Sequence, residues 1–193
     1  MNNDKFFIEH VSTPIGTMLL LTDDQDHLRA ADWEDYEARM HRLLRLHYGA
    51  GHTQLEPTSR ASTARYAVEA YYAGEISAID SLQVETGGTV FQREVWAALR
   101  AIPAGETISY GHLAAGLGRP KAVRAVGLAN GANPVGVVVP CHRVIGANAS
   151  LTGYGGGIER KRWLLQHERA AFLERRRAGH RPKIKDICRV RNV

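Results

Sequence analysis

The chain has 193 residues, of which 44% are hydrophobic and 23% are charged, a composition that excludes wholesale disorder and allows one large domain or two small ones. It contains no apolar run of membrane-spanning length, and its first residues lack the basic start and apolar core of a secretory signal. We therefore expect a cytoplasmic protein without a membrane partner. The two cysteines, Cys141 and Cys188, cannot form a disulfide framework, and there is no Cys-x-x-Cys pair or His-Glu-x-x-His helix. The sequence thus predicts no structural metal and no cofactor.

Charge is divided unevenly along the chain. Residues 1–90 carry seven Lys or Arg against fourteen Asp or Glu, whereas residues 91–168 carry nine against four and residues 169–193 nine against two. This division indicates that only the later part of the chain meets a polyanion such as nucleic acid. A net charge of +5 is also common in proteins that bind no nucleic acid, so charge alone leaves both interpretations open.

Three strands are predicted at the start of the chain. Residues 5–11, 17–22 and 28–33 are apolar segments, and the turn-forming residues at 12–16 and 23–27 separate them. This pattern predicts an antiparallel meander.

Two helices are predicted to follow. Residues 36–48 place four apolar side chains on one helical face: Met40, Leu43, Leu44 and Leu46. After a break at 49–58, Ser59 is expected to cap a second helix that ends at Ala73, before Gly74. Its expected apolar face consists of Tyr66, Val68, Ala70 and Tyr71. The segment 81–89 has the composition of a linker, which places a domain boundary near residues 87–88.

The second half is predicted to be mainly helical. Thr89 is the expected N-cap of a helix with a buried stripe of Val90, Val95, Trp96 and Leu99. Residues 107–134 predict two short helices, the first from Ser109 to Gly116 and the second from a first turn at Pro120 to Gly131. Two short helices joined by a glycine turn are typical of a helix-turn-helix, but an ordinary helical hairpin has the same pattern.

The second of these helices is built from small residues around one arginine. The small residues are Ala122, Ala125, Gly127 and Ala129, and the arginine is Arg124. Small side chains permit close approach, either to a neighbouring element of the same domain or to a DNA groove with Arg124 projecting into the base stack.

A reactive cysteine is suggested by the segment "NPVGVVVPCHRVIG" at residues 133–146. A valine run ends at Pro140 and is expected to place Cys141 at the mouth of a buried, strand-like segment. A thiol reacts as its thiolate, so Cys141 needs a base such as His142 or a positive charge such as Arg143. Neighbours on extended backbone point to opposite sides, so His142 would reach Cys141 only through a turn or a water. A buried structural cysteine remains the alternative.

A glycine-rich loop and a helix complete the candidate site. Residues 153–157 surround Tyr154 with glycines, which suits a lid over a flat ligand and does not match a phosphate-binding loop. The following helix is expected to bury Ile158, Trp163, Leu164 and Leu165. Glu168 at its end either orients His142 in a Glu–His–Cys relay or is a solvated helix-end residue.

Together these motifs resemble the O6-alkylguanine-DNA alkyltransferase family over roughly residues 91–168. The resemblance rests on "PCHRV" at 140–144, "SYGHLA" at 109–114, "RAVG" at 124–127, "NP" at 133–134, and "GYGGG" at 153–157 with "RWLLQHE" at 162–168. The motif order and the strand-rich acidic start look most like the bacterial, constitutively made branch. The resemblance implies DNA repair by a single, irreversible transfer of an alkyl group from O6-alkylguanine to the protein.

The resemblance also implies roles for individual residues. It makes Cys141 the alkyl acceptor, His142 its base through a water, Glu168 the support of His142, and Asn133 the brace of the turn that carries the active-site strand. Tyr110 would swing the phosphate aside and contact the flipped base, and Arg124 would fill the gap left in the stack. Backbone carbonyls of Cys141 and Val144 would read the guanine amino group. The remaining expected DNA or substrate contacts are Ser109, Ala125, Tyr154, Gly155 and Gly156.

The chain departs from the family pattern at two points. Some relatives hold zinc in the first domain through cysteines, but no cysteine precedes Cys141 here. Some relatives carry serine after the loop tyrosine, where this chain has Gly155. The basic extension at 169–193 lies beyond the match and is interpreted either as a DNA-gripping arm or as a solvated extension.

The sequence therefore predicts an α+β protein. Residues 1–88 are expected to form an α/β scaffold domain with a small antiparallel sheet, and residues 89–168 a mainly helical, helix-turn-helix domain that binds DNA and accepts the alkyl group. The expected partner is double-stranded DNA carrying O6-alkylguanine, and the expected state is a monomer. A non-catalytic reader of damaged DNA, a thiol hydrolase and an alkylation-switched regulator are the alternatives, and O4-alkylthymine is a further candidate substrate.

Overall fold

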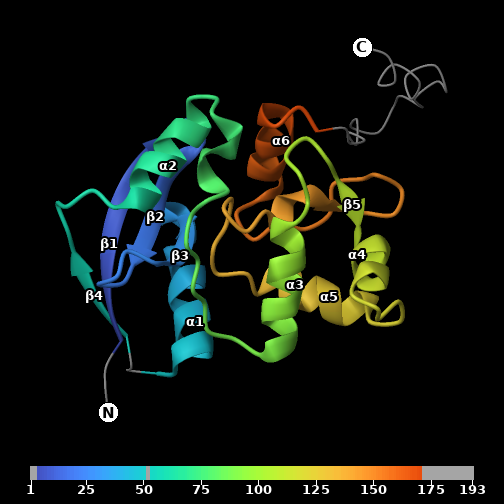
Figure 1. The fold of residues 1–193 in the computed structure, drawn as a ribbon, viewed down its shortest axis with the longest axis horizontal. Helices are drawn as coiled ribbons and strands as arrows, with labels where there is room; N and C mark the ends of the chain where they lie inside the picture. Colours follow the sequence, from blue (N-terminus) through green and yellow to red (C-terminus); the bar gives the residue numbers. More distant parts are fainter. Residues whose placement is uncertain (1–3, 51–52, 171–193) are drawn as a thin grey trace.

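The computed structural model describes residues 4–50 and 53–170. Of the predicted basic extension at 169–193, residues 171–193, including Cys188, therefore lie outside the described residues. Figure 1 shows a sheet with α1 and α2 on one side of the molecule and the helices α3 to α6 on the other.

The sheet has four strands in the order β3-β2-β1-β4. Its strands are β1 (Asp4–Thr13), β2 (Gly16–Thr22), β3 (Leu28–Trp33) and β4 (Thr53–Pro57). The first three pair antiparallel, which confirms the predicted meander. The expected break at 49–58 was wrong in part, because β4 pairs parallel to β1 there.

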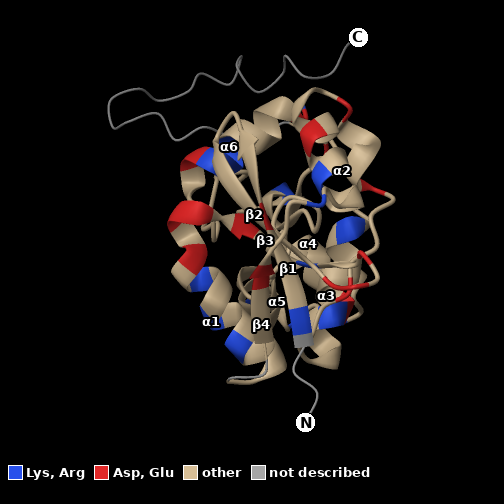
Figure 2. Cartoon of the chain, turned by 90° about the vertical axis from the view of Figure 1, so that its left-hand side faces the viewer, with Lys and Arg blue, Asp and Glu red and all other residues tan. Residues whose placement is uncertain are grey.

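Strand β2 shows how the sheet separates two cores. Its side chains alternate between the faces, so Met18 and Leu20 lie in the main core while Leu19 and Leu21 lie in a second cluster. That second cluster contains Met40 of α1 (Glu37–Tyr48). Helix α1 thus covers one face of the sheet, and the rest of the protein covers the other. The first turn of α1 contains the acidic Glu37 and its last turn contains Arg45, the arrangement that the helix dipole favours. Figure 2 shows basic positions along α1.

Two helical predictions in the first half need correction. Helix α2 (Thr63–Tyr72) is capped by Ser62, whose hydroxyl accepts a hydrogen bond from the Arg65 N–H at 3.1 Å, and not by Ser59. Leu46 and Tyr66 are each 63% exposed, so neither belongs to a core face. A short 3-10 turn, η1 (Glu34–Tyr36), leads into α1, and another, η2 (Ile76–Ile79), follows α2.

Up to residue 170, the second half contains four more helices. They are α3 (Val90–Arg100), α4 (Tyr110–Gly116), α5 (Val123–Gly131) and α6 (Ile158–His167). The predicted caps are confirmed: Thr89 forms a capping box with Gln92 on α3, and Ser109 caps α4. The prediction that Val90 is buried was wrong, since it is 65% exposed. Pro120 lies before α5 and not in its first turn.

Helices α4 and α5 pack against each other across residues 117–122. The mixed fold is as predicted. Whether the pair acts as a helix-turn-helix or is an ordinary hairpin stays a prediction.

The valine run before Cys141 is a set of turns, not the predicted strand. Val139 N–H donates to the Val135 carbonyl at 3.0 Å, and Val137 has a left-handed φ of 70°. Strand β3 anchors the run, because Ala31 N–H donates to the Pro134 carbonyl and the Ala31 carbonyl accepts from Gly136 N–H at 2.8 Å. The main core accordingly draws side chains from both sides of residue 88.

Two two-residue strands that the sequence did not predict lie beside the site. Strand β5 (Ile108–Ser109) pairs parallel with β6 (Val144–Ile145). This pairing joins the start of α4 to the segment just after Cys141. Among the described residues, no helix has the length and apolar character needed to cross a membrane.

Candidate active site

Cys141 begins the 3-10 turn η3 (Cys141–Arg143), directly after Pro140. It is 7% exposed and lies on the wall of a cavity of about 310 Å³. The cavity lining brings together Arg39, Tyr110, Gly127, Asn130, Gly131, Gly136, Cys141, Gly153, Tyr154 and Gly155. Predicted site residues from three separate segments, around 110, 141 and 154, therefore meet in one pocket.

The surroundings of Cys141 keep its sulfur in the thiol form at rest. Burial raises the pKa of the Cys141 thiol, while a hydrogen bond from Asn133 and the charges of Arg39 and Lys161 act in the opposite direction. Because the pKa stays above the ordinary value, the thiol needs a base before it can act as a nucleophile.

That base is present in a buried cluster around Glu168. The Glu168 Oε1 atom lies 3.1 Å from His142 Nε2, and Arg143 donates to both carboxylate oxygens at 2.8 and 2.9 Å. The Tyr71 hydroxyl donates to the same Oε1 at 2.9 Å. Burial alone would raise the pKa of Glu168, but His142 and Arg143 bring it well below its usual range, so the carboxylate is charged.

These contacts decide which nitrogen of His142 carries the proton. Glu168 is an ionised acceptor, so His142 Nε2 must donate to it. Burial lowers the pKa of His142, against the opposing effect of Glu168, and the ring is neutral at rest. Its Nδ1 atom is buried and has no protein partner among the described residues. A neutral imidazole with a free Nδ1 is equipped to accept a proton.

Asn133 holds the turn that leads to Cys141. It is 2% exposed; its amide donates to the Val139 carbonyl at 2.8 Å, and its oxygen accepts from Val135 N–H at 3.0 Å. These bonds close the turn across the left-handed Val137 and fix the direction in which Cys141 leaves it.

The glycine-rich segment packs against two side chains from the first half. A Cβ atom at Gly155 would lie 2.1 Å from Arg39 Nη1, and one at Gly156 would lie 2.3 Å from Trp33 Nε1. Arg160 fastens the same segment by donating to the Gly156 carbonyl at 3.1 Å and to the Ile15 carbonyl at 2.8 Å. Both glycines are therefore needed for close packing. In the same segment, the ring of Tyr154 lies 6.4 Å from the ring of His142, centroid to centroid.

The α4 and α5 residues of the predicted site divide between pocket and surface. The Ser109 hydroxyl accepts from His112 N–H at 3.1 Å and so starts α4, which carries Tyr110 into the pocket. Burial raises the pKa of the Tyr110 hydroxyl, which remains protonated. Arg124 and Ala125 are exposed on α5 and lie outside the pocket lining.

Val144 is fully buried, and its carbonyl accepts a 2.6 Å hydrogen bond from Lys161 Nζ. Lys161 also donates to the Thr152 carbonyl at 2.8 Å. Burial lowers the pKa of this lysine to about 8. The lysine thus ties the segment after Cys141 to the start of the glycine-rich segment.

The sequence did not point to several residues that shape the site. They are Arg39, Tyr71, Asn130 and Lys161, with Arg143 foreseen only as a positive charge near the thiol and not as the partner of Glu168. Arg39 and Tyr71 come from the first half of the chain, and their contacts with the site follow from the tertiary fold and not from a local pattern.

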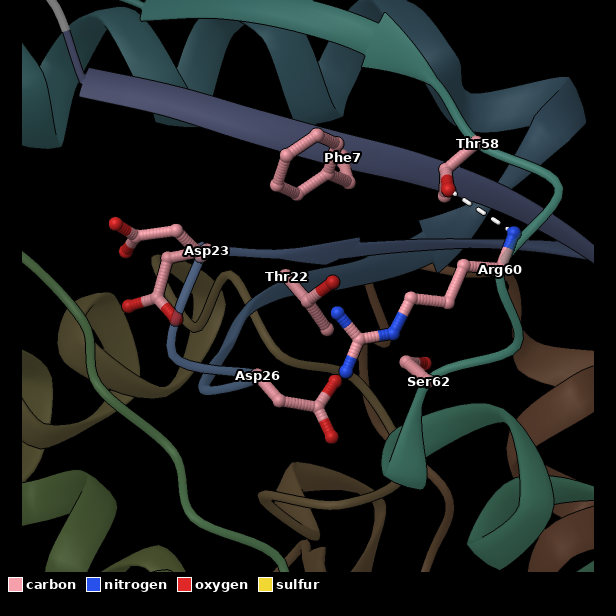
Figure 3. Close-up of a pocket in the computed structure, with 8 residues that line it drawn as sticks. Phe7, Thr22, Asp23, Asp26, Thr58, Arg60 and Ser62 are labelled. Carbon is pink, nitrogen blue, oxygen red and sulfur yellow. Dashed lines mark hydrogen bonds between the residues drawn. The ribbon is translucent and has the colours of Figure 1, made fainter.

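A second pocket, of about 70 Å³, lies on the sheet and shares no lining residue with the first. Its lining includes the aspartates Asp23, Asp24 and Asp26. Figure 3 labels Asp23 and Asp26 and shows the Arg60 side chain reaching across the pocket. Asp23 also belongs to a group with His27 and Glu85 whose ligand atoms lie within 4.8 Å of one another. Arg29 donates to the Asp23 carboxylate at 2.6 Å and lies 2.7 Å from that of Glu85. A guanidinium thus already neutralises the group, which fits an ion-pair network better than a metal site.

Comparisons with known proteins agree with this geometry. Residues 90–170 match the family described as 6-O-methylguanine DNA methyltransferase, DNA binding domain. A methylated-DNA–protein-cysteine methyltransferase of Salmonella typhimurium is 53% identical over 161 residues, which cover 83% of this chain and 94% of that protein. The crystal structure of Mycobacterium tuberculosis OGT in complex with DNA superposes with a TM-score of 0.68 at 40% identity, covering 86% of this chain and 92% of the other. An O6-methylguanine-DNA methyltransferase from the hyperthermophilic archaeon Pyrococcus kodakaraensis gives 0.67 at 27% identity over 84% and 98%.

The fold and the cysteine site thus define a DNA-repair protein of the methyl-transferring class. More particularly, the chain belongs to the methylated-DNA–protein-cysteine methyltransferase family. The predicted family, the predicted enzyme class and the mixed α+β fold are confirmed.

Proposed function

We propose that Cys141 takes the alkyl group from O6-alkylguanine in duplex DNA, once for each protein molecule. The observation that carries the proposal is the position of this thiol, which lies on the wall of a pocket and next in sequence to His142, whose Nε2 is held by Glu168. A nucleophile, a base and a group that orients the base form the arrangement that covalent catalysis requires.

The reaction begins when His142 Nδ1 accepts the thiol proton, through a water molecule, and becomes an imidazolium that the charged Glu168 stabilises. The Cys141 thiolate then attacks the alkyl carbon in line with the bond to the guanine oxygen. The sulfur–carbon bond forms as the carbon–oxygen bond breaks, and the electron pair of the broken bond stays with the guanine. The guanine anion then takes up a proton, which balances the one that His142 accepted from the thiol. A hydrogen bond from the Tyr110 hydroxyl to the base would stabilise the charge that develops there.

The product is a thioether, which has no easy route back to a thiol. One protein molecule therefore removes one lesion. This separates the proposal from a thiol hydrolase, whose thioester intermediate is cleaved by water and returns the cysteine.

The substrate must leave the base stack, because the alkyl carbon is inaccessible inside a duplex. We propose that α4 and α5 approach the minor groove, with the exposed Arg124 filling the space of the flipped base and Ala125 permitting close contact. Ser109 begins α4 beside the DNA backbone, and Tyr110 turns the phosphate. Similarity to a protein crystallised with DNA supports DNA as the partner.

Inside the pocket, Tyr154, Gly155 and Gly156 would cover the flipped base, and the carbonyls of Cys141 and Val144 would accept from its amino group. The Val144 carbonyl already accepts from Lys161, but a carbonyl has two lone pairs and can accept a second hydrogen bond.

We further propose that residues 1–88 serve as a scaffold, that residues 89–168 bind DNA and carry out the transfer, and that the protein acts as a monomer. The scaffold is not passive, because Arg39 and Tyr71 reach the site from it.

The test is the fate of the lesion in DNA. A duplex with one O6-methylguanine is incubated with a small excess of protein, and the nucleosides are then separated by chromatography. The proposal predicts conversion of O6-methylguanine to guanine by the wild type and none by Cys141→Ser. Lesion-selective binding without conversion would favour a damage reader and overturn the proposal.

A further inference from the structure

The hydroxyl of Tyr71 is the one donor to Glu168 that comes from the first half of the chain, among the described residues. Tyr71 lies in α2, is fully buried, and is 97 positions from Glu168. A second contact holds the same two segments together, because the Tyr71 carbonyl lies 2.7 Å from His167 Nε2. The tyrosine is thus fixed by both its backbone and its side chain against the end of α6.

We propose that Tyr71 is a positioning residue for alkyl transfer, whose hydroxyl sets how the Glu168 carboxylate holds His142. This inference rests on the proposed function, in which His142 is the base for Cys141. It assigns part of the catalytic arrangement to the domain expected to serve only as a scaffold.

Three side chains meet at one carboxylate oxygen of Glu168. Glu168 Oε1 receives the Tyr71 hydroxyl at 2.9 Å, Arg143 Nη2 at 2.8 Å and His142 Nε2 at 3.1 Å. Three donors around one oxygen leave little freedom for the carboxylate to rotate, so His142 has one available orientation. The hydrogen bond from the hydroxyl also makes the Glu168 carboxylate a weaker base, so its attraction for a proton on His142 is weaker.

Loss of the hydroxyl should therefore strengthen the attraction between Glu168 and protonated His142. The imidazolium becomes more stable, the pKa of His142 rises, and less neutral base is present at acid pH. The titratable and charged groups that face His142 from the elements packed around it are Glu168 and Lys161 of the α6 segment, Cys141 and Arg143 of η3, Tyr154 of the glycine-rich segment and, through Glu168, Tyr71 of α2. Only the Tyr71 contact is changed by removing its oxygen.

The experiment compares Tyr71→Phe with Tyr72→Phe as a matched control. Tyr72 is the next residue of α2, and its hydroxyl contacts Met18 Sδ at 3.4 Å and not Glu168. The rate of methyl transfer from duplex DNA is measured by rapid quench from pH 5 to pH 9. For Tyr71→Phe we expect the acid limb of the pH–rate profile to move to higher pH by about half a unit. At pH values on the acid limb, the rate should then be about threefold lower than in the wild type. Tyr72→Phe should retain the wild-type profile.

A Tyr71→Phe profile that coincides with the wild type and with Tyr72→Phe would overturn the inference. A wild-type protein that transfers no methyl group would instead overturn the proposed function, so the two failures are distinct. A purely structural role for Tyr71 would lower the melting temperature without moving the acid limb.

A second measurement needs neither a variant nor DNA. In nuclear magnetic resonance of the wild type, the Tyr71 hydroxyl proton should exchange slowly and show an Overhauser contact with a proton on His142 Nε2. A His142 ring whose Nε2 lacks a proton at neutral pH would contradict the arrangement on which the inference depends.

Discussion

Replacing Glu168 by glutamine should be among the most destabilising single changes in the protein. Glu168 is 5% exposed and Arg143 is 3% exposed, and the two are joined by two hydrogen bonds. Glutamine keeps the size of the side chain but leaves a buried guanidinium without a counter-charge. Removal of one partner of such a pair costs about 3–5 kcal/mol, against a total stability of about 5–15 kcal/mol for a typical domain. For a chain of this length the melting temperature should fall by about 6–20 °C.

The assay is urea unfolding followed by circular dichroism, with Glu159→Gln as the control. Glu159 pairs with Arg162 on the surface of α6, and its side chain is 79% exposed. Its replacement should change the free energy of unfolding by less than about 0.5 kcal/mol. Equal unfolding midpoints for Glu168→Gln and Glu159→Gln would show that the buried pair of Glu168 and Arg143 does not stabilise the fold.

The same variant has a defined dependence on pH. The pKa of Glu168 is lowered in the folded protein, so its stabilising contribution is fully present above the unfolded value of about 4.3 and is lost as pH falls toward the folded value. The difference in stability between the wild type and Glu168→Gln should therefore be constant from pH 6 to pH 8 and shrink below about pH 4.

Three further predictions concern the surroundings of the site. Asn133→Ala removes the bonds to Val135 and Val139 and leaves the buried Val135 N–H without its acceptor, which should cost about 2 kcal/mol in urea unfolding. A change below about 0.5 kcal/mol would contradict the bracing role. Gly155→Ser places a Cβ atom against the Arg39 guanidinium, which Asp32 holds at 2.9 Å, so we expect a loss of about 1–3 kcal/mol in a thermal melt; an unchanged melting temperature would mean that Arg39 moves freely. Lys161 has a pKa of about 8 in the folded protein, below its value in the unfolded chain, so the unfolded state binds more protons between about pH 8 and pH 10. The stability of the wild type relative to Lys161→Met should therefore rise over that range, by at most about 1.4 kcal/mol per pH unit. A stability difference that does not change with pH would argue against a buried charged lysine.

The sequence predicted those parts of the fold that depend on neighbouring residues. The meander follows from apolar segments separated by turns, and the caps at Thr89 and Ser109 follow from a hydroxyl placed before a helical pattern. Strand β4 was missed because its side chains are only partly buried and its partner, β1, is distant in sequence. The valine run was taken for a strand because β-branched residues favour strands, whereas Asn133 and the contact with Ala31 fold it into turns.

The candidate site was predicted in its motifs but not in its supports. The order and spacing of the motifs indicated Cys141, His142 and Glu168 as site residues, and the structure places His142 and Glu168 in contact. Lys161 was missed because it lies between Arg160 and Arg162 and reads as part of a solvated basic face. Its ammonium group is hydrogen-bonded inside the protein to the carbonyls of Val144 in β6 and of Thr152, just before the glycine-rich segment. Such contacts depend on how distant segments meet, and a local pattern does not contain that information.

The proposed mechanism requires that Cys141 is the acceptor and that each protein molecule reacts once. The measurement that tests it most directly is intact-protein and peptide mass spectrometry after incubation with a tenfold excess of duplex DNA carrying O6-methylguanine. We expect a gain of one methyl group per protein, located on Cys141, with no further gain over time and none in Cys141→Ser. A methyl group on another residue, or continued conversion of the excess lesion by unmodified protein, would contradict it.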